Sequence, residues 1–241
     1  METSEGGLLG GRLRYTQPCR GFRSGIEPIL LAAAVPARSG EQVLEAGSGA
    51  GAALLCLAAR VPDIAGVGVE RDSELAEVAR RNATANGFSG LQFVAAAIAE
   101  AGPFGDFDHA FANPPYHPSS GTPSPDSMRR SAKQGSPELL GEWTAAMAAC
   151  LHHRATLTLI VQAAALPTAL AALGVAGCPA SVLFPLWRRV GDPAKLVLLQ
   201  GVKGGRGPFR LLAGLALHRA DGSFTPAADA VLREGVNLDL G

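Results

Sequence analysis

Three glycines within five residues separate a short apolar segment from a longer one, and this spacing constrains the fold more than any other feature of the chain. The short segment is 42–46, the loop is Gly47-Ser48-Gly49-Ala50-Gly51, and an apolar helical run over 50–61 overlaps its end. Glycines at a strand-to-helix turn let the backbone approach a ligand closely, and they direct the N–H groups of the helix N-terminus at it. The pattern therefore predicts a strand, a ligand-binding turn and a helix in succession.

An acidic residue ends the next predicted strand, which covers 66–70. Glu70 follows Gly47 by about 20 residues, the distance at which a carboxylate accepts hydrogen bonds from ribose hydroxyls in nucleotide-binding folds. The glycine pattern alone does not identify the nucleotide. Ala52 completes a G-x-G-x-x-A pattern, which a nicotinamide-dependent oxidoreductase would also tolerate.

The segment Asn113-Pro114-Pro115-Tyr116 follows another apolar run, 107–112. Neither proline has a backbone N–H, so the backbone here offers carbonyl acceptors without competing donors, and two φ angles are fixed. The Asn113 side chain adds a carbonyl and Tyr116 adds an aromatic face. An exocyclic amino group on a base can donate to these oxygens while its ring stacks on Tyr116, which orients the nitrogen lone pair toward an incoming methyl group. The alternative is an ordinary turn at a strand end, where Asn and Pro are common.

Strands and helices alternate along the chain. After an extended piece at 12–18 and a loop at 20–25, the predicted elements are helix 27–35, strand 42–46, helix 50–61, strand 66–70, helix 72–86, strands 91–95 and 107–112, helix 138–153, strand 156–162, helix 165–173 and strands 180–186, 195–202 and 209–218. The stretch 118–137 is predicted to be a long functional loop. The alternation predicts one α/β domain over 1–241, with a lead-in or lid over 1–40 and a core over 41–241. Its sheet is expected to be doubly wound, seven-stranded and Rossmann-like, with an antiparallel edge strand.

The formal charge is balanced overall but not along the chain. Residues 41–126 hold four basic and eleven acidic side chains, whereas 129–219 hold eleven basic and three acidic ones. A basic half suits a phosphate-bearing substrate, and a solvated surface would have the same composition. The candidates for contacts to RNA phosphates are Arg129, Arg130 and Lys133 in the long loop, with Arg188, Arg189 and the run 203–210 extending the basic stretch.

Several other site classes are not expected. The four cysteines are far apart, so neither a zinc site nor a disulfide framework is predicted. His152 and His153, on a predicted helix, point in two directions and form no metal site, and His109 is expected to be structural. The N-terminus lacks a basic, apolar leader, and Gln162 and Pro167 interrupt the apolar stretch 157–180. We therefore expect a cytoplasmic protein without a membrane segment or a metal.

Together, the glycine loop, Glu70 and the Asn-Pro-Pro-Tyr segment resemble a class I S-adenosylmethionine-dependent methyltransferase. More narrowly, the chain resembles the bacterial tRNA1(Val) adenine-37 N6-methyltransferase family, within the small-domain methyltransferases that carry this tetrapeptide. The resemblance runs from the lead-in 22–31 through 43–51, 69–70 and 82–86 to the tetrapeptide and covers most of the length. It implies S-adenosylmethionine as the cofactor.

The resemblance also implies roles for individual residues. Asn113, Pro114, Pro115 and Tyr116 would receive the adenine, Glu70 would hold the ribose, and the glycine loop would pass the methionine part. The implied cofactor contacts are Gly25, Glu45, Gly47, Ser48, Gly49, Gly51, Glu70, Arg71, Ala97 and Asn113. Two positions depart from the family pattern. Ala97 stands where the family usually places an acid that contacts the cofactor's adenine, and Glu27-Pro28 stands where relatives often have Asp-Gly or Asp-Ala.

The function implied by this resemblance is methyl transfer to the exocyclic nitrogen of adenine in RNA, above all in a tRNA anticodon loop, whose partly stacked bases are inexpensive to extrude. Other functions remain open. A protein glutamine methyltransferase would carry a helical domain before the fold, where this chain has a short lead-in, and a DNA adenine methyltransferase would need a target-recognition domain. A nicotinamide-dependent oxidoreductase leaves the tetrapeptide unexplained. A non-catalytic RNA-binding protein on this scaffold is consistent with Ala97.

Overall fold

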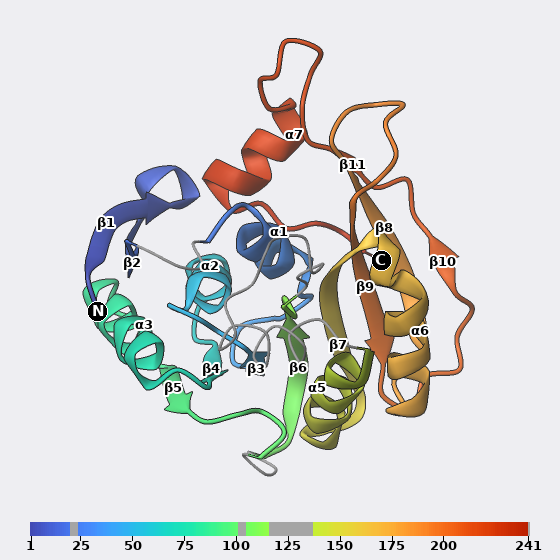
Figure 1. Ribbon diagram of the computed structural model, residues 1–241, viewed down its shortest axis with the longest axis horizontal. Helices are drawn as coiled ribbons and strands as arrows, with labels where there is room; N and C mark the ends of the chain where they lie inside the picture. The colour runs from blue at the N-terminus through green and yellow to red at the C-terminus, as the bar shows by residue number, and fades with distance from the viewer. Residues whose placement is uncertain (20–23, 101–104, 116–136, 241) are drawn as a thin grey trace, which may run out of the picture.

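The computed structural model describes residues 1–19, 24–100, 105–115 and 137–240 (Figure 1). Tyr116, Arg129, Arg130 and Lys133 lie outside the described residues, as does most of the predicted loop 118–137.

A mixed sheet of nine strands forms the centre of the molecule (Figure 1). The strand order is β10-β8-β9-β7-β6-β3-β4-β5, and β11 also pairs with β8. The strands are β3 (Gln42–Ala46), β4 (Ala65–Glu70), β5 (Leu91–Ala95), β6 (Phe107–Ala112), β7 (Leu151–Gln162), β8 (Ala180–Trp187), β9 (Leu196–Val202), β10 (Arg210–Leu211) and β11 (Leu215–Ala216).

Most strands run in one direction. Strands β5, β4, β3, β6 and β7 are parallel, and β9 lies antiparallel between β7 and β8. Because β8 is antiparallel to β9, it is parallel to β7. The carboxyl ends of β3, β4, β6, β7 and β8 therefore lie along one edge of the sheet, which we call the carboxyl edge, and their starts lie along the opposite, amino edge.

Seven of the eight strands predicted between residues 42 and 218 are present. The sheet has nine strands rather than the expected seven, and its arrangement differs from the prediction at two points. The antiparallel strand lies inside the sheet rather than at its edge. The strand predicted over 209–218 is instead two two-residue strands, β10 and β11, both parallel to β8. Gly214 lies between them with φ +81°, a left-handed conformation that interrupts an extended strand.

Helices cover both faces of the sheet (Figure 1). Successive residues of a strand point to opposite faces, and here Val43 packs in one buried apolar cluster and Leu44 in the other. The first cluster includes α1 (Glu27–Ala34), α2 (Ala52–Arg60) and α3 (Ser73–Ala85), and the second includes α5 (Pro137–Ala149) and α6 (Leu166–Val175). The short helical segments are η1 (Leu9–Gly11), η2 (Ala163–Ala165), α7 (Pro226–Asp229) and the π-helical turn η3 (Ala230–Glu234).

Helix α5 is shorter than predicted. It ends at Ala149, and β7 begins at Leu151, so His152 and His153 lie on a strand rather than on a helix. His152 Nε2 lies 2.9 Å from Asp108 Oδ1 on β6, and the hydrogen bond to Asp108 raises the pKa of His152. His109 is buried and bonds to Glu41 and Thr156, in agreement with its expected structural role. These polar contacts join the starts of β3, β6 and β7 at the amino edge.

Two further sequence expectations concern membranes and cysteines. Within the described part of the chain, no helix is long and apolar enough to cross a membrane. All four cysteines lie among the described residues and are unbridged. Cys56, Cys150 and Cys178 are buried, and Cys19 is half-buried.

An N-terminal hairpin lies against α3 (Figure 1). It consists of β1 (Thr3–Leu8) and β2 (Leu13–Pro18), of which only the second was predicted. Asn82 of α3 accepts a hydrogen bond from the Thr16 N–H at 2.9 Å, and its amide donates to the carbonyls of Thr16 and Ala50 at 2.8 and 2.9 Å. One buried side chain therefore ties the hairpin, α3 and the glycine loop together.

Replacing Asn82 by Ala should lower the free energy of unfolding by about 3 kcal/mol, because one buried and two half-buried backbone groups would lose their partner and each such loss costs about 1–3 kcal/mol before relaxation. Urea unfolding measures the change. Asn86→Ala is the matched control, since Asn86 bonds to Arg14 in the same way but is more exposed. Its cost should be about 1 kcal/mol. Equal costs at the two positions would contradict the role given to Asn82.

Candidate active site

The glycine loop leaves β3 in a left-handed turn that is held by β4. The backbone N–H groups of Gly47 and Ser48 both donate to the Val69 carbonyl, at 2.8 and 3.1 Å. Gly47, Gly49 and Gly51 have φ angles of +68°, +55° and +88°, which side chains with a Cβ adopt only at a cost. The predicted requirement for glycine at these three positions thus follows from the turn itself.

Glu70 lies directly beside this loop. Its Oε2 accepts from the Gly49 N–H at 2.9 Å, and its Oε1 accepts from the Asp72 N–H at 2.9 Å. A carboxylate has about four lone-pair sites, so each oxygen keeps one for a further donor. The two backbone bonds fix the orientation of the carboxylate at the carboxyl edge while leaving it able to accept two hydroxyl hydrogens.

Asn113 lies next to the glycine loop, between β3 and β6. From β3 the next strands along the chain, β4 and β5, lie on one side, whereas β6 and β7 lie on the other, so the strand order reverses here. Strands β3 and β6 are neighbours, with Ala46 opposite Ala112. Gly47 and Asn113 each follow that pair by one residue, so their strands are about 4.8 Å apart. In open α/β sheets, ligands bind at such a switch point beyond the carboxyl ends of the strands. Pro114 is buried, and Asn113 and Pro115 are half-buried.

Glu45 and Ser48 lie deeper than the other members of the predicted cofactor set. Glu45 is 4% exposed, and its Oε2 accepts from the Leu54 N–H in α2 at 3.1 Å. Burial raises the pKa of Glu45 to about 8, so this carboxyl group is largely protonated at neutral pH. The hydroxyl of Ser48 is buried and has no hydrogen-bond partner among the described residues.

Three other residues were predicted to contact the cofactor: Arg71 directly follows Glu70, Ala97 lies in the turn after β5, and Gly25 lies just before α1. Arg71 and Gly25 are exposed, and Ala97 is half-buried. After β5, the Ala96 N–H donates to the Glu70 carbonyl at 2.9 Å, which brings this turn beside Glu70. The Ala97 carbonyl accepts from the Glu100 N–H at 3.0 Å. The backbone of Ala97 is therefore already engaged in a turn, with one lone pair still available.

Trp143 of α5 is a residue that sequence reasoning missed. A Cβ added to Gly47 would lie 2.5 Å from Cη2 and 2.9 Å from Cζ3 of Trp143, so the far edge of the indole packs on the Gly47 backbone. Buried Leu140 and Met147 lie three and four residues away in α5, a helical spacing that places Trp143 on the sheet-facing side. That spacing could have indicated its direction, but nothing in the sequence links it to the glycine loop.

The basic residues of the second half divide between the two edges of the sheet. Arg188 and Arg189 follow β8 at the carboxyl edge, where Arg189 donates to the Arg219 carbonyl at 3.2 Å. Lys203 lies at the amino edge, since its backbone bonds with Arg154 and Ala155 at the start of β7. The span of β9 separates the two places by about 20 Å. The run 203–210 therefore does not extend a track from Asn113, contrary to the sequence expectation.

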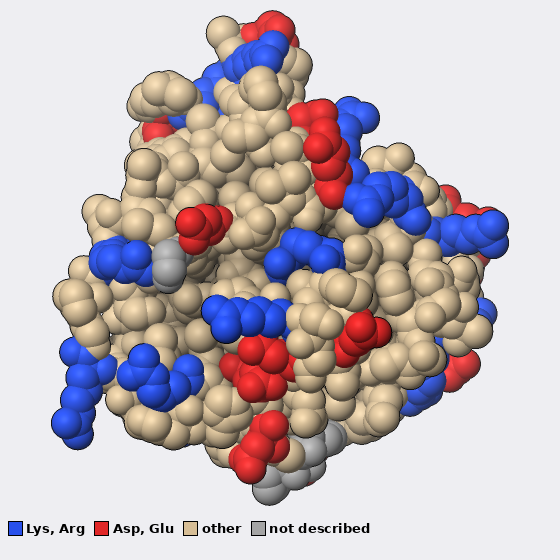
Figure 2. Space-filling view, turned by 180° about the vertical axis from the view of Figure 1, so that it is seen from behind, with Lys and Arg blue, Asp and Glu red and all other residues tan. Residues whose placement is uncertain are grey.

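Positive charge does not form one continuous surface on the side shown in Figure 2. Lys and Arg side chains lie there in separate groups, with Asp and Glu side chains between them. A phosphate-bearing partner would meet local basic sites on this side rather than a broad basic face.

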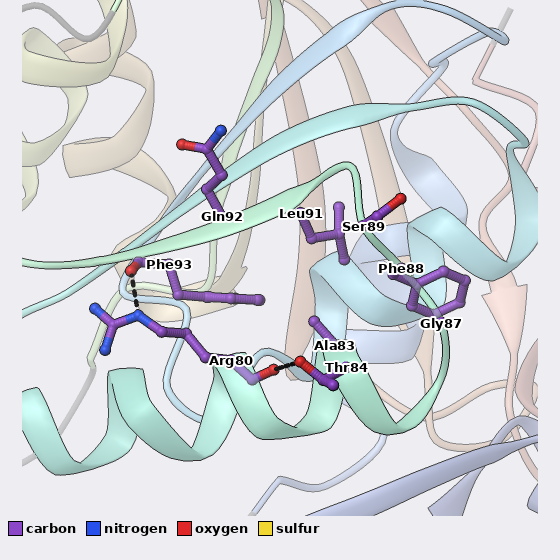
Figure 3. A pocket seen from close by; sticks show the side chains of 9 residues that line it. All are labelled: Arg80, Ala83, Thr84, Gly87, Phe88, Ser89, Leu91, Gln92 and Phe93. Atoms are coloured by element: carbon purple, nitrogen blue, oxygen red, sulfur yellow. Dashed lines mark hydrogen bonds between the residues drawn. The ribbon is translucent and has the colours of Figure 1, made fainter.

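A cavity of about 540 Å³ lies between α3 and the edge strand β5 (Figure 3). Arg80 donates through Nε to the Phe93 carbonyl at 2.9 Å, and Thr84 donates to the Arg80 carbonyl at 3.0 Å. Arg80 thereby covers an otherwise free carbonyl of the sheet edge. Arg80 is the one charged side chain in the lining, and it is already bonded to the Phe93 carbonyl, so this cavity is a weaker candidate for chemistry than the carboxyl edge.

Residues 27–136 match the sequence model of the methyltransferase small domain family. Among solved structures, a predicted O-methyltransferase from Agrobacterium tumefaciens is 24% identical, with a TM-score of 0.70, over 88% of this chain and 97% of that one. A Thermus thermophilus 16S rRNA N2-methyltransferase, RsmC, in complex with S-adenosylmethionine and guanosine is 18% identical, with a TM-score of 0.57, over 84% of this chain and 50% of that one. TrmN from the same organism is 20% identical, with a TM-score of 0.55, over 74% and 48%. No curated protein matches the sequence.

The solved structures share the class I methyltransferase fold, and the family match over 27–136 is to a methyltransferase small domain. The expected fold class is thus confirmed, and so is the cofactor class. The residues present fit this cofactor. The three left-handed glycines keep the loop free of side chains, no described atom lies within 4 Å of a Cβ added at Gly49, and the oriented Glu70 carboxylate can accept two hydroxyls.

Replacing Gly47 by Ala should cost about 3 kcal/mol or more of folding free energy, because the new methyl group meets Trp143 and the left-handed backbone adds roughly 1–2 kcal/mol. Gly49→Ala is the matched control, because a Cβ there meets no described atom and only the left-handed backbone is strained. Its cost in folding free energy should be about 1–2 kcal/mol. Urea unfolding measures both. In the double variant Gly47→Ala with Trp143→Ala, the new methyl group no longer meets the indole. Its loss of unfolding free energy should therefore be smaller than the sum of the losses in the two single variants. Additive costs would show that the indole does not press on Gly47.

Proposed function

We propose that the protein methylates the exocyclic amino group of adenine in RNA, with tRNA as the first candidate substrate. The observation that carries the proposal is the juxtaposition of Asn113-Pro114-Pro115 and the glycine loop, one residue beyond the paired Ala46 and Ala112. In this proposal residues 1–241 act as one catalytic domain in the cytoplasm, and residues 1–40 serve as its lead-in.

In this proposal the described residues hold the cofactor and orient the amino group, and Tyr116 stacks on the base. Bound S-adenosylmethionine supplies an electrophilic methyl group. Glu70 holds the ribose hydroxyls, and the Gly47–Gly51 turn lets the backbone approach the methionine part. The Asn113 side-chain oxygen and the Pro114 carbonyl accept the two hydrogens of the substrate amino group. These bonds orient the nitrogen lone pair toward the methyl group, and water takes the proton after transfer.

The hydrogen-bond acceptors at Asn113 favour an amino group over a hydroxyl group as the group that receives the methyl. Amide and prolyl carbonyls are neutral acceptors, and they do not remove a proton at neutral pH. A hydroxyl needs a general base to become a good nucleophile, whereas an aromatic amine needs only correct orientation. Asn113 therefore suits an amine.

RNA is supported by two observations, one structural and one comparative. Arg188 and Arg189 lie at the same edge of the sheet as Asn113, and Arg129, Arg130 and Lys133 follow Asn113 in the sequence. RsmC, whose fold covers most of this chain, is a 16S rRNA methyltransferase. This chain spans about half of the length of RsmC. The proposed RNA substrate therefore rests first on the residues of this chain.

The decisive experiment offers possible acceptors in parallel. Purified protein is incubated with labelled S-adenosylmethionine and with unmodified tRNA, total RNA or protein extract, and the products are digested and separated. The proposal expects label in N6-methyladenosine from tRNA. Label in glutamine would support a protein substrate. Binding of NADH in preference to S-adenosylmethionine would instead support an oxidoreductase.

Asn113 and Glu70 should separate chemistry from cofactor binding. Asn113→Ala should lower kcat by about a hundredfold or more with little change in cofactor affinity, because it removes an acceptor that acts in the transition state. Glu70→Ala should weaken S-adenosylmethionine binding by about tenfold or more, since hydrogen bonds to a charged group contribute about 1.5–3 kcal/mol each. Calorimetry and single-turnover kinetics measure the two effects. Near-normal turnover of Asn113→Ala would remove Asn113 from the mechanism.

Arg188 and Arg189 should contribute to the salt dependence of tRNA binding. Each neutralised phosphate changes the slope of log affinity against log salt by about −0.7 to −0.9. The double variant Arg188→Ala with Arg189→Ala should therefore flatten the slope by about one to two units. The matched control is Lys203→Ala with Arg206→Ala, which removes the same charge after β9 at the amino edge. If the two double variants have the same slope, binding follows net charge and not a track beside Asn113.

A further inference from the structure

The sheet is stepped where β6 meets β7. Ala112, the last residue of β6, pairs with Leu159, whereas β7 continues beyond this pair to Gln162. Two prolines follow Asn113, and they have no backbone N–H to donate to a neighbouring strand, so the pairing of β6 with β7 ends here. The end of β7 therefore stands about 10 Å past the end of β6, directly beside Asn113.

Gln162 is an exposed amide at the end of a buried run. Residues 157–161 are each at most 1% exposed, whereas Gln162 is exposed. Its side-chain amide forms no hydrogen bond with the described part of the chain. The residues that follow, 163–165, are all alanines, so Gln162 carries the polar group at this end of β7. An amide in such a place binds either solvent or a ligand, and its position relative to Asn113 decides between them.

Asn113 and Gln162 lie on the same face of the sheet. Successive residues of a strand point to opposite faces, and Phe111 and Ile160 both belong to the buried cluster that includes α1, α2 and α3. Asn113 follows Phe111 by two residues, and the proline after it favours an extended backbone. Gln162 follows Ile160 by two residues, and its φ of −64° and ψ of 141° are also extended. Both side chains therefore leave the sheet toward this face, with their Cα atoms about 8 Å apart.

The strand order places the rest of the substrate base on the β7 side of Asn113. Glu70 ends β4, the glycine loop follows β3, Asn113 follows β6, and β7 is the next strand. In a direct displacement, the acceptor nitrogen approaches the methyl group from the side opposite the sulfur. With the ribose at Glu70 and the amino group at Asn113, the base extends away from the cofactor and toward the end of β7.

We propose that Gln162 is a substrate-binding residue whose amide donates a hydrogen bond to the ring nitrogen beside the amino group held at Asn113. Adenine has an unprotonated ring nitrogen at this position of its Watson–Crick edge, which is the edge that enzymes read on an extruded base. The bond adds a second contact in the plane of the base and fixes its rotation about the amino group. This inference rests on the proposed function, since Asn113 is taken to hold the amino group.

Binding of short RNAs tests the inference without methyl transfer. Two fluorescein-labelled nonamers carry adenine or guanine between uridines, and fluorescence anisotropy measures their dissociation constants with saturating S-adenosylhomocysteine. Guanine has an N–H donor where adenine has the ring acceptor. Gln162→Glu keeps the size of the side chain and removes its donor, because a carboxylate only accepts. The new charge repels the phosphates of both RNAs equally, so the ratio of the two dissociation constants isolates the contact with the base.

In Gln162→Glu, the preference for adenine relative to guanine should fall about three- to tenfold, the range for losing one hydrogen bond. In Gln162→Leu, both RNAs should bind about three- to tenfold more weakly with little change in their ratio, since a glutamine amide can rotate to serve either base. Gln92→Glu is the matched control. Gln92 is exposed on the distant edge strand β5 and likewise has no hydrogen-bond partner among the described residues. Its ratio should equal that of the wild type.

Three results would overturn the inference: an unchanged ratio in Gln162→Glu, the same change of ratio in Gln92→Glu, and failure of the wild type to bind either RNA. The last result would also remove RNA from the proposed function. Methylation of the adenine nonamer with an unchanged ratio in Gln162→Glu would refute the base contact alone. A ratio that depends on Gln162 without any methyl transfer would refute the proposed reaction and leave the base contact intact.

Discussion

The Val69 carbonyl accepts two successive N–H groups, and the rest of the site depends on this interaction. Gly47 and Ser48 both donate to it, so the chain must leave β3 by bending toward β4 instead of continuing as a strand. That bend requires left-handed backbone at Gly47, Gly49 and Gly51, and the last of these is the N-cap residue of α2. The same turn directs the Gly49 N–H at Glu70, so loop and carboxylate are positioned together.

The two edges of the sheet carry different kinds of polar group. At the amino edge, polar side chains bond to one another, as in the pairs His109–Glu41 and His152–Asp108, and these bonds hold the starts of the central strands in place. At the carboxyl edge, Glu70 keeps lone pairs for further donors, and Asn113 offers a neutral carbonyl. Groups that satisfy one another stabilise the fold, whereas groups with unused capacity can bind a ligand.

Much of this arrangement could be predicted because its causes are local. The strands 42–46, 91–95 and 107–112 are short apolar runs bounded by polar residues or turns, and the structure has the same limits. The prediction that the helix continues to residue 153 was wrong, because the partners that make 151–155 a strand lie on β6 and just after β9, far away in the sequence. The contact of Trp143 with Gly47 was missed for the same reason. Likewise, the run 203–210 continues the basic stretch in sequence, but the antiparallel direction of β9 takes it to the amino edge.

Proton transfer is not what the described part of this site is built for. The one strongly perturbed acid near the loop is Glu45, whose pKa is raised to about 8 by burial. A raised pKa in a cleft often marks a general acid or base, but Glu45 is 4% exposed and is bonded to the Leu54 N–H beneath the loop. It therefore supports the start of α2 and does not face the acceptor. Among the described residues, the groups next to Asn113 are a neutral amide, prolyl carbonyls and backbone N–H groups, which orient a substrate without changing their own charge. A site of this composition accelerates the reaction by alignment. It suits an exocyclic amine whose lone pair is turned toward the methyl group by two accepted hydrogen bonds and whose proton passes to water after the methyl group has moved.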